Sequence, residues 1–228
     1  MEGKHIFLWV VIQVYMHKIS TIIFDLGGVI LDLDQGKTLR AFSRKGLDLE
    51  DVNDTSPLFN DFETGKISAA DFRQGIKSLF KGNITDTEID EAWNAMLLDT
   101  YEERFSIIEG LQKQFRIYLL SNTNSIHIDF VRNYLSQTFG LERWDNLFVK
   151  QYLSYEIGLR KPNEDIYEFV LNDIDKHAQE CLFIDDSFAN IKGAASIGIH
   201  TLQALHPLDQ EMLSNIKQII SAQKKGIS

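Results

Sequence analysis

Short apolar runs that each stop at a polar side chain constrain the fold of this chain more than any other feature. The three clear runs stop at Asp25, Ser121 and Asp185 and cover residues 21–24, 116–120 and 182–184. Continuous apolar runs, rather than alternating ones, are typical of strands covered on both faces, as in parallel sheets. Ligands bind such sheets outside the carboxyl ends of the strands, which is where these three polar residues lie.

Helical patterns fill the intervals between the runs. Apolar residues recur at helical spacing within residues 126–135 and 166–174, and residues 189–197 form a segment rich in small side chains. Weaker apolar runs at 147–149 and 199–202 supply two further candidate strands. The alternation of strands and helices predicts an α/β fold with a Rossmann-like, doubly wound parallel sheet.

One stretch of about 70 residues breaks this alternation, and it contains no good strand pattern. Its helical patterns cover residues 38–45, 68–80 and 85–97. Ser68 and Thr85 are typical N-caps, because each is followed three residues later by an acid. The stretch is too long for an ordinary crossover connection. We therefore predict a helical cap domain at 34–104, inserted into a core domain formed by 18–33 and 105–228.

Composition excludes some classes of function. The chain has 228 residues, with 23 Lys and Arg against 33 Asp and Glu, which gives a formal net charge of −10. Nucleic-acid binding requires clustered cations, so this balance argues against it. The single cysteine, Cys181, lies in an apolar run and is expected to be a buried strand residue. One cysteine permits no internal disulfide, which is consistent with a reducing, cytoplasmic location.

The N-terminal segment, residues 1–17, is an extension of uncertain status. Residues 6–15 are apolar except for Gln13, but a membrane-spanning helix needs about 20 such residues. We therefore expect no membrane association. One hypothesis is that Met16 is the true start, and detection of a native peptide that begins before Met16 would contradict it.

The first two polar strand ends suit phosphate chemistry. Asp25 precedes Gly27 and Gly28, and glycine allows a ligand to approach the backbone closely, although this spacing also occurs in simple turns. Ser121 and Asn122 offer a hydroxyl and amide groups that could hold phosphate oxygens. The same polar segment could equally cap the helix that follows it.

Two later segments add a cation and an acidic pair. Lys161 lies in a turn before Pro162, where it could neutralise a phosphate or an aspartate nucleophile; most lysines are simply solvated. Asp185 and Asp186 are adjacent carboxylates at a strand end, and oxygen ligands of this kind suit Mg²⁺. The alternative is an acidic first turn of the next helix, where acids are favourable without a metal.

Taken together, the order Asp25, Ser121, Lys161, Asp185 resembles the haloacid dehalogenase-like (HAD) superfamily. The resemblance extends from about residue 20 to 205 and rests on four segments: 24–30 (FDLGGVI), 120–124 (LSNTN), 158–167 (GLRKPNEDIY) and 183–187 (FIDDS). It is strongest to the glucose-1-phosphate phosphatase-like branch, which carries a helical cap after the first segment.

The resemblance implies a mechanism and a role for each residue. The carboxylate matching Asp25 attacks phosphorus, becomes an aspartyl phosphate and is released by water. Mg²⁺ is bound by Asp25, Asp185 and the backbone carbonyl of residue 27, with Asp186 as a direct or indirect partner. Ser121 and the Asn122 amide hold phosphoryl oxygens, and Lys161 offsets the negative charge. The substrate is expected to be a small phosphorylated metabolite, with a sugar phosphate favoured.

Two positions depart from the family pattern. Gly27 stands where most family phosphatases have a second Asp that protonates the leaving group, and such acid–base help is typically worth about 10²–10⁴-fold. A good leaving group, a substitute such as Asp32 or Asp34, or a weak catalytic function would each accommodate the loss. Ala189 stands where many relatives have an acid, and Asp186 is a candidate to supply that charge.

Three alternatives stay open on sequence alone. A metal-independent haloacid dehalogenase shares the aspartate nucleophile, but the pair Asp185 and Asp186 favours a metal. A catalytically weak regulator or phosphoryl-ligand binding protein on the same fold is compatible with Gly27. A signalling receiver has the acidic pair first and no room for the insert.

Residues that could line a substrate pocket, but more often pack inside a cap, are Phe59, Phe62, Trp93 and Met96. The sequence does not predict an oligomeric state.

Overall fold

The computed structural model describes residues 18–47, 57–80 and 82–225. The hypothesis about Met16 and the status of residues 1–17 lie outside the described residues. Five parallel strands form one sheet in the order β3-β2-β1-β4-β5. Their bounds are β1 Thr21–Phe24, β2 Arg116–Ser121, β3 Lys150–Leu153, β4 Cys181–Asp185 and β5 His200–Gln203. The central strand β1 lies between β2 and β4, so the residues that follow these three strands meet at one sheet edge.

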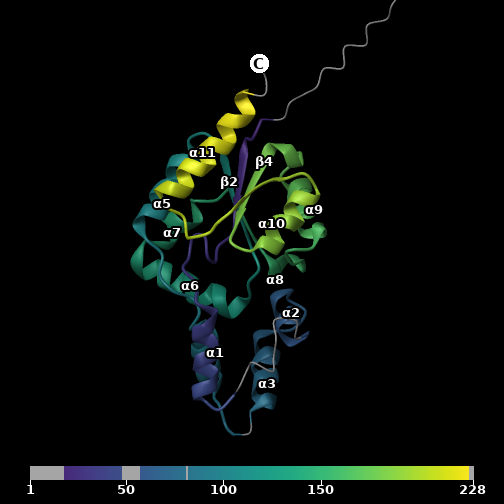
Figure 1. Cartoon of the computed structure of the whole chain (residues 1–228). Helices are drawn as coiled ribbons and strands as arrows, with labels where there is room; N and C mark the ends of the chain where they lie inside the picture. Colours follow the sequence, from purple (N-terminus) through teal and green to yellow (C-terminus); the bar gives the residue numbers. More distant parts are fainter. Residues whose placement is uncertain (1–17, 48–56, 81, 226–228) are drawn as a thin grey trace, which may run out of the picture.

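Helices cover both faces of the sheet, which confirms the doubly wound α/β prediction (Figure 1). Ile22 and Phe24 of β1 face one hydrophobic cluster, whereas Ile23 between them faces the other. The first cluster is completed by α5 Glu102–Gln112, α6 Ser125–Thr138, α7 Leu141–Asp145 and α11 Gln210–Lys225. The second is completed by α9 Glu164–Asp173 and α10 Phe188–Ser196, and the short α8 Ser154–Ile157 and η2 Ala178–Glu180 lie in the connections. Every residue of β1 is buried, as its unbroken apolar sequence requires.

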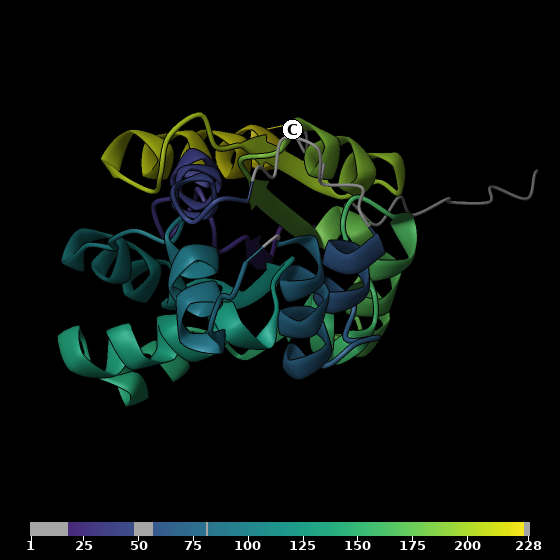
Figure 2. The ribbon, with the colours of Figure 1, turned by 90° about the horizontal axis from the view of Figure 1, so that it is seen from below.

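We call residues 34–104 the helical insert; its described helices before α5 lie beyond the carboxyl ends of the strands (Figure 1). These helices are α1 Gln35–Arg44, α2 Pro57–Glu63, α3 Ala69–Leu79 and α4 Asp86–Asn94. They enclose a hydrophobic cluster rich in aromatic rings, to which Ile126 of α6 also belongs. In the view from below, they lie in front of the sheet (Figure 2). The described part of the insert contains no strand of the sheet.

The predicted caps of two insert helices are confirmed. Ser68 accepts a hydrogen bond from the backbone of Asp71, whose carboxylate accepts one from the backbone of Ser68. Thr85 and Glu88 make the same reciprocal pair at the start of α4. Each pair satisfies two backbone N–H groups that the helix itself cannot bond, which explains why both helices begin where the sequence predicts.

One local prediction is wrong. The apolar run at 147–149 is not a strand; Leu147 and Phe148 are buried in the first cluster, and β3 begins only at Lys150. Asn163 is the N-cap of α9, so Pro162 precedes that helix. Among the described residues, no helix is both long and apolar enough to cross a bilayer.

Candidate active site

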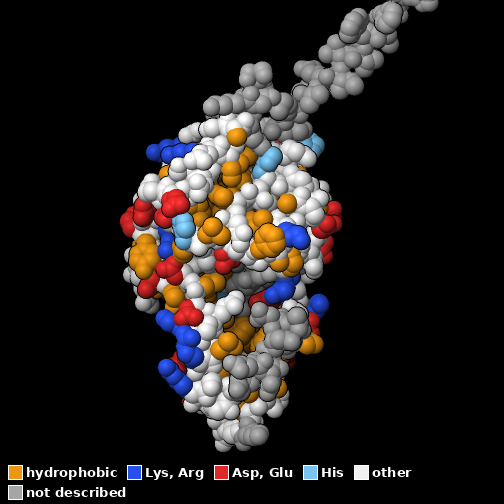
Figure 3. Space-filling model, viewed as in Figure 1, with side chains coloured by type: hydrophobic (Ala, Val, Ile, Leu, Met, Phe, Trp, Pro, Cys, Tyr) orange, Lys and Arg blue, Asp and Glu red, His pale blue; other side chains and the backbone are white. Residues whose placement is uncertain are grey.

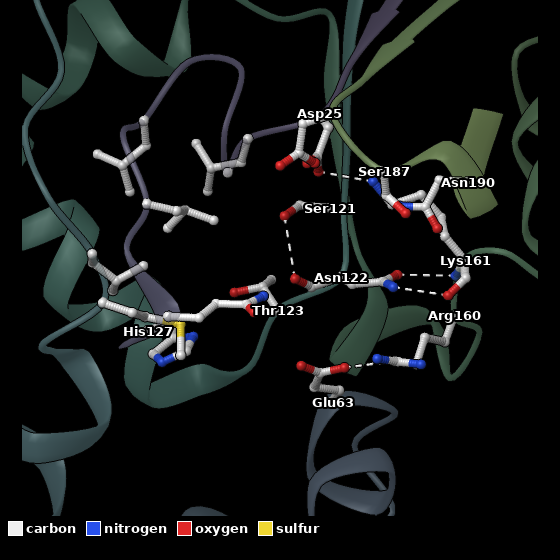
Figure 4. Close-up of a pocket in the computed structure, with 18 of the residues that line it drawn as sticks. Asp25, Glu63, Ser121, Asn122, Thr123, His127, Arg160, Lys161, Ser187 and Asn190 are labelled. Atoms are coloured by element: carbon white, nitrogen blue, oxygen red, sulfur yellow. Dashed lines mark hydrogen bonds and ion pairs between the residues drawn. The ribbon is translucent and has the colours of Figure 1, made fainter. Parts of the chain in front are cut away.

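The polar residues predicted to meet at the sheet edge do meet, and all of them except the fully buried Asp185 line one cavity. The cavity has a volume of about 410 Å³, and Asp25, Ser121, Asn122, Lys161 and Asp186 are among its lining residues. It lies between the sheet domain and the helical insert, where the surface is hollowed (Figure 3). Figure 4 shows side chains from separate segments around this space. Each of the three clear apolar runs therefore marks a strand of the sheet, and the polar residue at its end lies at the site.

Three carboxylates form the acidic part of the site. Asp25, Asp185 and Asp186 each have an oxygen within 4.8 Å of the others. Asp25 and Asp185 are buried, whereas Asp186 is exposed. Burial raises the pKa of Asp25 to about 7 even though Lys161 opposes the shift. Burial and the adjacent Asp185 raise the pKa of Asp186. Protons or a cation must offset this concentration of charge, and a set of hard oxygen donors fits Mg²⁺.

Lys161 forms ion pairs with two of these carboxylates. Its ammonium Nζ lies 2.8 Å from Asp25 Oδ1, 2.6 Å from Asp185 Oδ2 and 2.8 Å from the carbonyl oxygen of Leu120. All three donor positions of the ammonium are thus used, and the side chain is only 1% exposed. Burial lowers the pKa of Lys161, but the two carboxylates raise it by more, so the net pKa is raised and the charge is retained. The alternative of a solvated surface lysine is wrong.

The side chain of Asn122 fixes the turn that carries Lys161. Its Nδ2 donates to the carbonyl of Lys161 at 2.9 Å, and the backbone N–H of Lys161 donates to Asn122 Oδ1 at 2.9 Å (Figure 4). The adjacent Ser121 is buried, and its hydroxyl has only a long contact of 3.5 Å with a neighbouring carbonyl. That hydroxyl lines the cavity and can reorient toward a ligand. Asn124, rather than either of these residues, caps α6.

The turn after β1 is shaped by two glycines with different tasks. Gly28 has a φ of +70°, and any side chain there would overlap the carboxylate of Asp186. Position 28 therefore admits only glycine if Asp186 keeps its place. A side chain at Gly27 would instead overlap the methyl end of Leu33, which fills the space where an acid at position 27 would begin.

Neither candidate substitute for the missing acid lines the cavity. Asp32 pairs with Arg104 at 2.7 Å, and Asp34 pairs with Arg40 at 2.9 Å. Both carboxylates are thus held in ion pairs, and neither is among the residues that line the cavity with Asp25.

Comparison with known proteins now identifies the family. Residues 19–198 match the family model described as haloacid dehalogenase-like hydrolase. The chain belongs to the haloacid dehalogenase-like hydrolases. It is 34% identical over 191 residues to D-ribitol-5-phosphate phosphatase from Bacteroides thetaiotaomicron, an alignment that covers 81% of this chain and 91% of the relative.

Solved structures agree with this assignment. A HAD family enzyme from Bacteroides thetaiotaomicron, in complex with magnesium and inorganic phosphate, is 35% identical with a TM-score of 0.74, over 81% of this chain and 93% of that chain. A HAD-like family hydrolase from Porphyromonas gingivalis is 34% identical with a TM-score of 0.74, over 81% and 90% of the two chains. The predictions of a HAD fold and of an enzyme are confirmed. The glucose-1-phosphate phosphatase-like branch stays a prediction.

Within this hydrolase, Asn190 is a site residue that the sequence did not reveal. Its Nδ2 lies 3.0 Å from both carboxylate oxygens of Asp185, and the backbone N–H of Ser187 donates to Asp185 Oδ1 at 2.8 Å. Together with Lys161, these donors hold Asp185 in one orientation. The expected acid position, Ala189, lines the cavity, but it is the next residue that contacts Asp185.

His127 also lines the cavity, and its contacts show that it is neutral. Asn124 Oδ1 accepts from the backbone of His127, so the Nδ2 of Asn124 faces and donates to the imidazole Nδ1 at 3.2 Å. The imidazole Nε2 is therefore protonated and donates to the carbonyl of Trp93 at 3.2 Å. Burial lowers the pKa of His127 to about 4. With both ring nitrogens engaged, His127 is unsuited to replace the missing acid.

Proposed function

We propose that this hydrolase is a Mg²⁺-dependent phosphatase that acts through an aspartyl phosphate on Asp25. The observation that carries the proposal is the buried cluster in which Lys161 bridges Asp25 and Asp185 beside Asp186. A dehalogenase needs no metal, whereas three carboxylates within 4.8 Å form a site suited to a divalent cation.

Each side chain then has a distinct task. Asp25 forms a bond from its carboxylate oxygen to phosphorus while the bond from phosphorus to the alcohol oxygen breaks, and water later hydrolyses the acyl phosphate. Lys161 holds Asp25 Oδ1 and offsets negative charge as the phosphoryl group approaches. The Ser121 hydroxyl and the Asn122 backbone amide hold phosphoryl oxygens.

The metal ligands would be Asp25, Asp185, Asp186 and the backbone carbonyl of Gly27. Bound Mg²⁺ supplies positive charge that reduces the repulsion between a carboxylate nucleophile and a phosphate. Asn190 and Ser187 keep Asp185 oriented before any metal binds, which lowers the cost of assembling the site.

The substrate that we propose is a phosphorylated sugar or sugar alcohol, after the D-ribitol-5-phosphate phosphatase that this chain resembles. The volume of about 410 Å³ falls within the usual range of about 300–1,000 Å³ for small-molecule pockets. We further propose that residues 34–104 act as a cap domain on the core of residues 18–33 and 105–228, because they supply Gln35, Glu63, Met96 and Leu97 to the cavity lining.

The test is turnover of a panel of phosphomonoesters, with D-ribitol 5-phosphate, glucose 1-phosphate and p-nitrophenyl phosphate as members. Phosphate release is expected in Mg²⁺, and EDTA should abolish it. Asp25→Asn should reduce release to background, whereas Asp145→Asn, which removes an exposed carboxylate paired with Arg132, should not. Halide release from 2-chloropropionate in EDTA would instead identify a dehalogenase. A protein that binds phosphate esters without turning them over would identify a regulator.

A further inference from the structure

An ion pair lines the cavity at the end away from Asp25 (Figure 4). Glu63 is the last residue of α2 in the helical insert, and Arg160 lies in the turn before α9. Arg160 Nε donates to Glu63 Oε2 at 2.6 Å across 97 residues of sequence, and both side chains line the cavity. Figure 4 shows the pair at the opposite end of the view from Asp25, with Asn122 between them.

The backbone next to this ion pair is tightly packed. Gly65, two residues after Glu63, has a φ of +67° and lies so close to the carbonyl oxygen of Tyr155 that any side chain there would overlap it. The end of α2 thus packs directly against the backbone of α8, next to the segment that leads to Arg160. The exposed fractions of the Glu63 and Arg160 side chains are 20% and 31%, so the pair is partly shielded from water.

The rest of the cavity wall makes this pair distinctive. Outside the cluster of Asp25, Lys161 and Asp186, Glu63 and Arg160 are the only charged side chains among the described residues that line the cavity. Four other lining residues are apolar: Leu31, Leu33, Met96 and Leu97. Beyond the strand ends, this pair therefore offers a ligand its charged contacts, beside the neutral polar side chains of Gln35 and Thr123.

The pair suits neutral hydroxyl groups. The guanidinium uses Nε for Glu63, and within the described part of the chain its two terminal NH₂ groups contact no other protein acceptor. They remain as donors for ligand oxygens. A second anionic group would be attracted by Arg160 but repelled by Glu63, whereas a hydroxyl can accept from the guanidinium and donate to the carboxylate. We propose that Glu63 and Arg160 determine specificity by binding the hydroxyl groups of a polyol phosphate, an inference that rests on the proposed phosphatase function.

The test compares two substrates of equal chain length, D-ribitol 5-phosphate and pentyl phosphate, which has no hydroxyl groups. Arg160→Met and Glu63→Gln should each lower kcat/KM for D-ribitol 5-phosphate by about 10–100-fold, because polar groups of the bound ligand are left unpaired in a partly shielded site. Most of the loss should appear in KM, as expected for binding contacts away from the reacting atoms. Turnover of pentyl phosphate should change by no more than about twofold, which also shows that the neighbouring Lys161 is still in place.

Asp90→Asn is the matched control, because it breaks the Arg73–Asp90 ion pair inside the insert, which does not line the cavity. It should leave the ratio of the two kcat/KM values unchanged. Equal losses on both substrates for Arg160→Met would show that the pair only positions the insert, and no loss on either would also overturn the proposal. A wild-type protein that uses pentyl phosphate as well as D-ribitol 5-phosphate would refute specificity while leaving the phosphatase function intact. A wild-type protein inactive on every phosphomonoester would overturn both.

Discussion

The substitution Lys161→Met removes the cation that lies between two buried carboxylates while keeping an unbranched side chain of similar length. In the metal-free protein, Asp25 and Asp185 would then face each other without compensation, and the carbonyl of Leu120 would also lose a donor. The exposed fractions of the three side chains are 1% for Lys161, 11% for Asp25 and 0% for Asp185, so water cannot replace the ammonium readily.

Breaking a buried ion pair by removing one partner typically costs about 3–5 kcal/mol. For a chain of this size, 1 kcal/mol shifts Tm by about 2–4 °C, so the expected loss is about 6–20 °C. The control Lys176→Met breaks the pair with Glu180, whose side chains are 26% and 19% exposed, and should cost only about 0.2–1 kcal/mol.

The assay is urea unfolding followed by circular dichroism, in EDTA at pH 8, with both variants and the wild type. A second comparison uses the double variant Asp25→Asn/Lys161→Met, which should be more stable than Lys161→Met alone because one stranded carboxylate has been removed. If Lys161→Met unfolds at the same urea concentration as Lys176→Met, the ammonium does not hold the site together and the reasoning is wrong.

Further outcomes follow from the same contacts. Burial raises the pKa of Asp25 to about 7, so the metal-free wild type should lose stability as pH rises from about 4 to 7. The variant Asp25→Asn should lack this loss in thermal melts with EDTA. Identical pH profiles for the two proteins would contradict the prediction. Gly65→Ala should lower the free energy of unfolding in urea by about 1–3 kcal/mol more than Gly46→Ala, since both glycines have positive φ but only Gly65 abuts a carbonyl oxygen. Equal losses would count against tight packing between α2 and α8. Gly27→Asp combined with Leu33→Ala should raise kcat for alkyl phosphates by up to about 10²-fold, and an unchanged kcat would show that the missing acid is not limiting.

The sheet and the acidic strand ends could be predicted because their signals are local. The unbroken apolar run at 21–24 must be buried on both faces, and the carboxylate of Asp25 must then emerge at the sheet edge. Likewise, Ser68 and Thr85 each satisfy backbone groups within three residues, so the helix starts are encoded next to the caps. In contrast, β3 begins at the exposed Lys150 as an edge strand, and no apolar run marks such a strand.

Contacts between distant segments were beyond sequence reasoning. Arg160 contacts Glu63 although 97 residues separate them in the chain. Nothing in the sequence around either residue distinguishes it from an ordinary charged residue on the surface. Asn190 contacts Asp185 because α10 turns its side chain back toward the strand end, one residue past the position where an acid was expected. His127 gave no signal of its own, because its neutral state is set by Asn124 and by the carbonyl of Trp93 in the insert.

The distribution of charge along the cavity links the missing acid to the choice of substrate. Positive and negative groups are concentrated at the strand ends, where Lys161 and the carboxylates meet the phosphoryl group. On the leaving-group side, Leu33 fills the space beside Gly27 and the neutral His127 has both nitrogens engaged, so among the described lining residues neither position supplies a proton. The departing alcohol must then be a good leaving group or be held by other donors. Away from the departing oxygen, the guanidinium of Arg160 is held by Glu63, and its NH₂ groups, which contact no other described acceptor, can donate to the hydroxyl groups of a hydroxyl-rich alcohol.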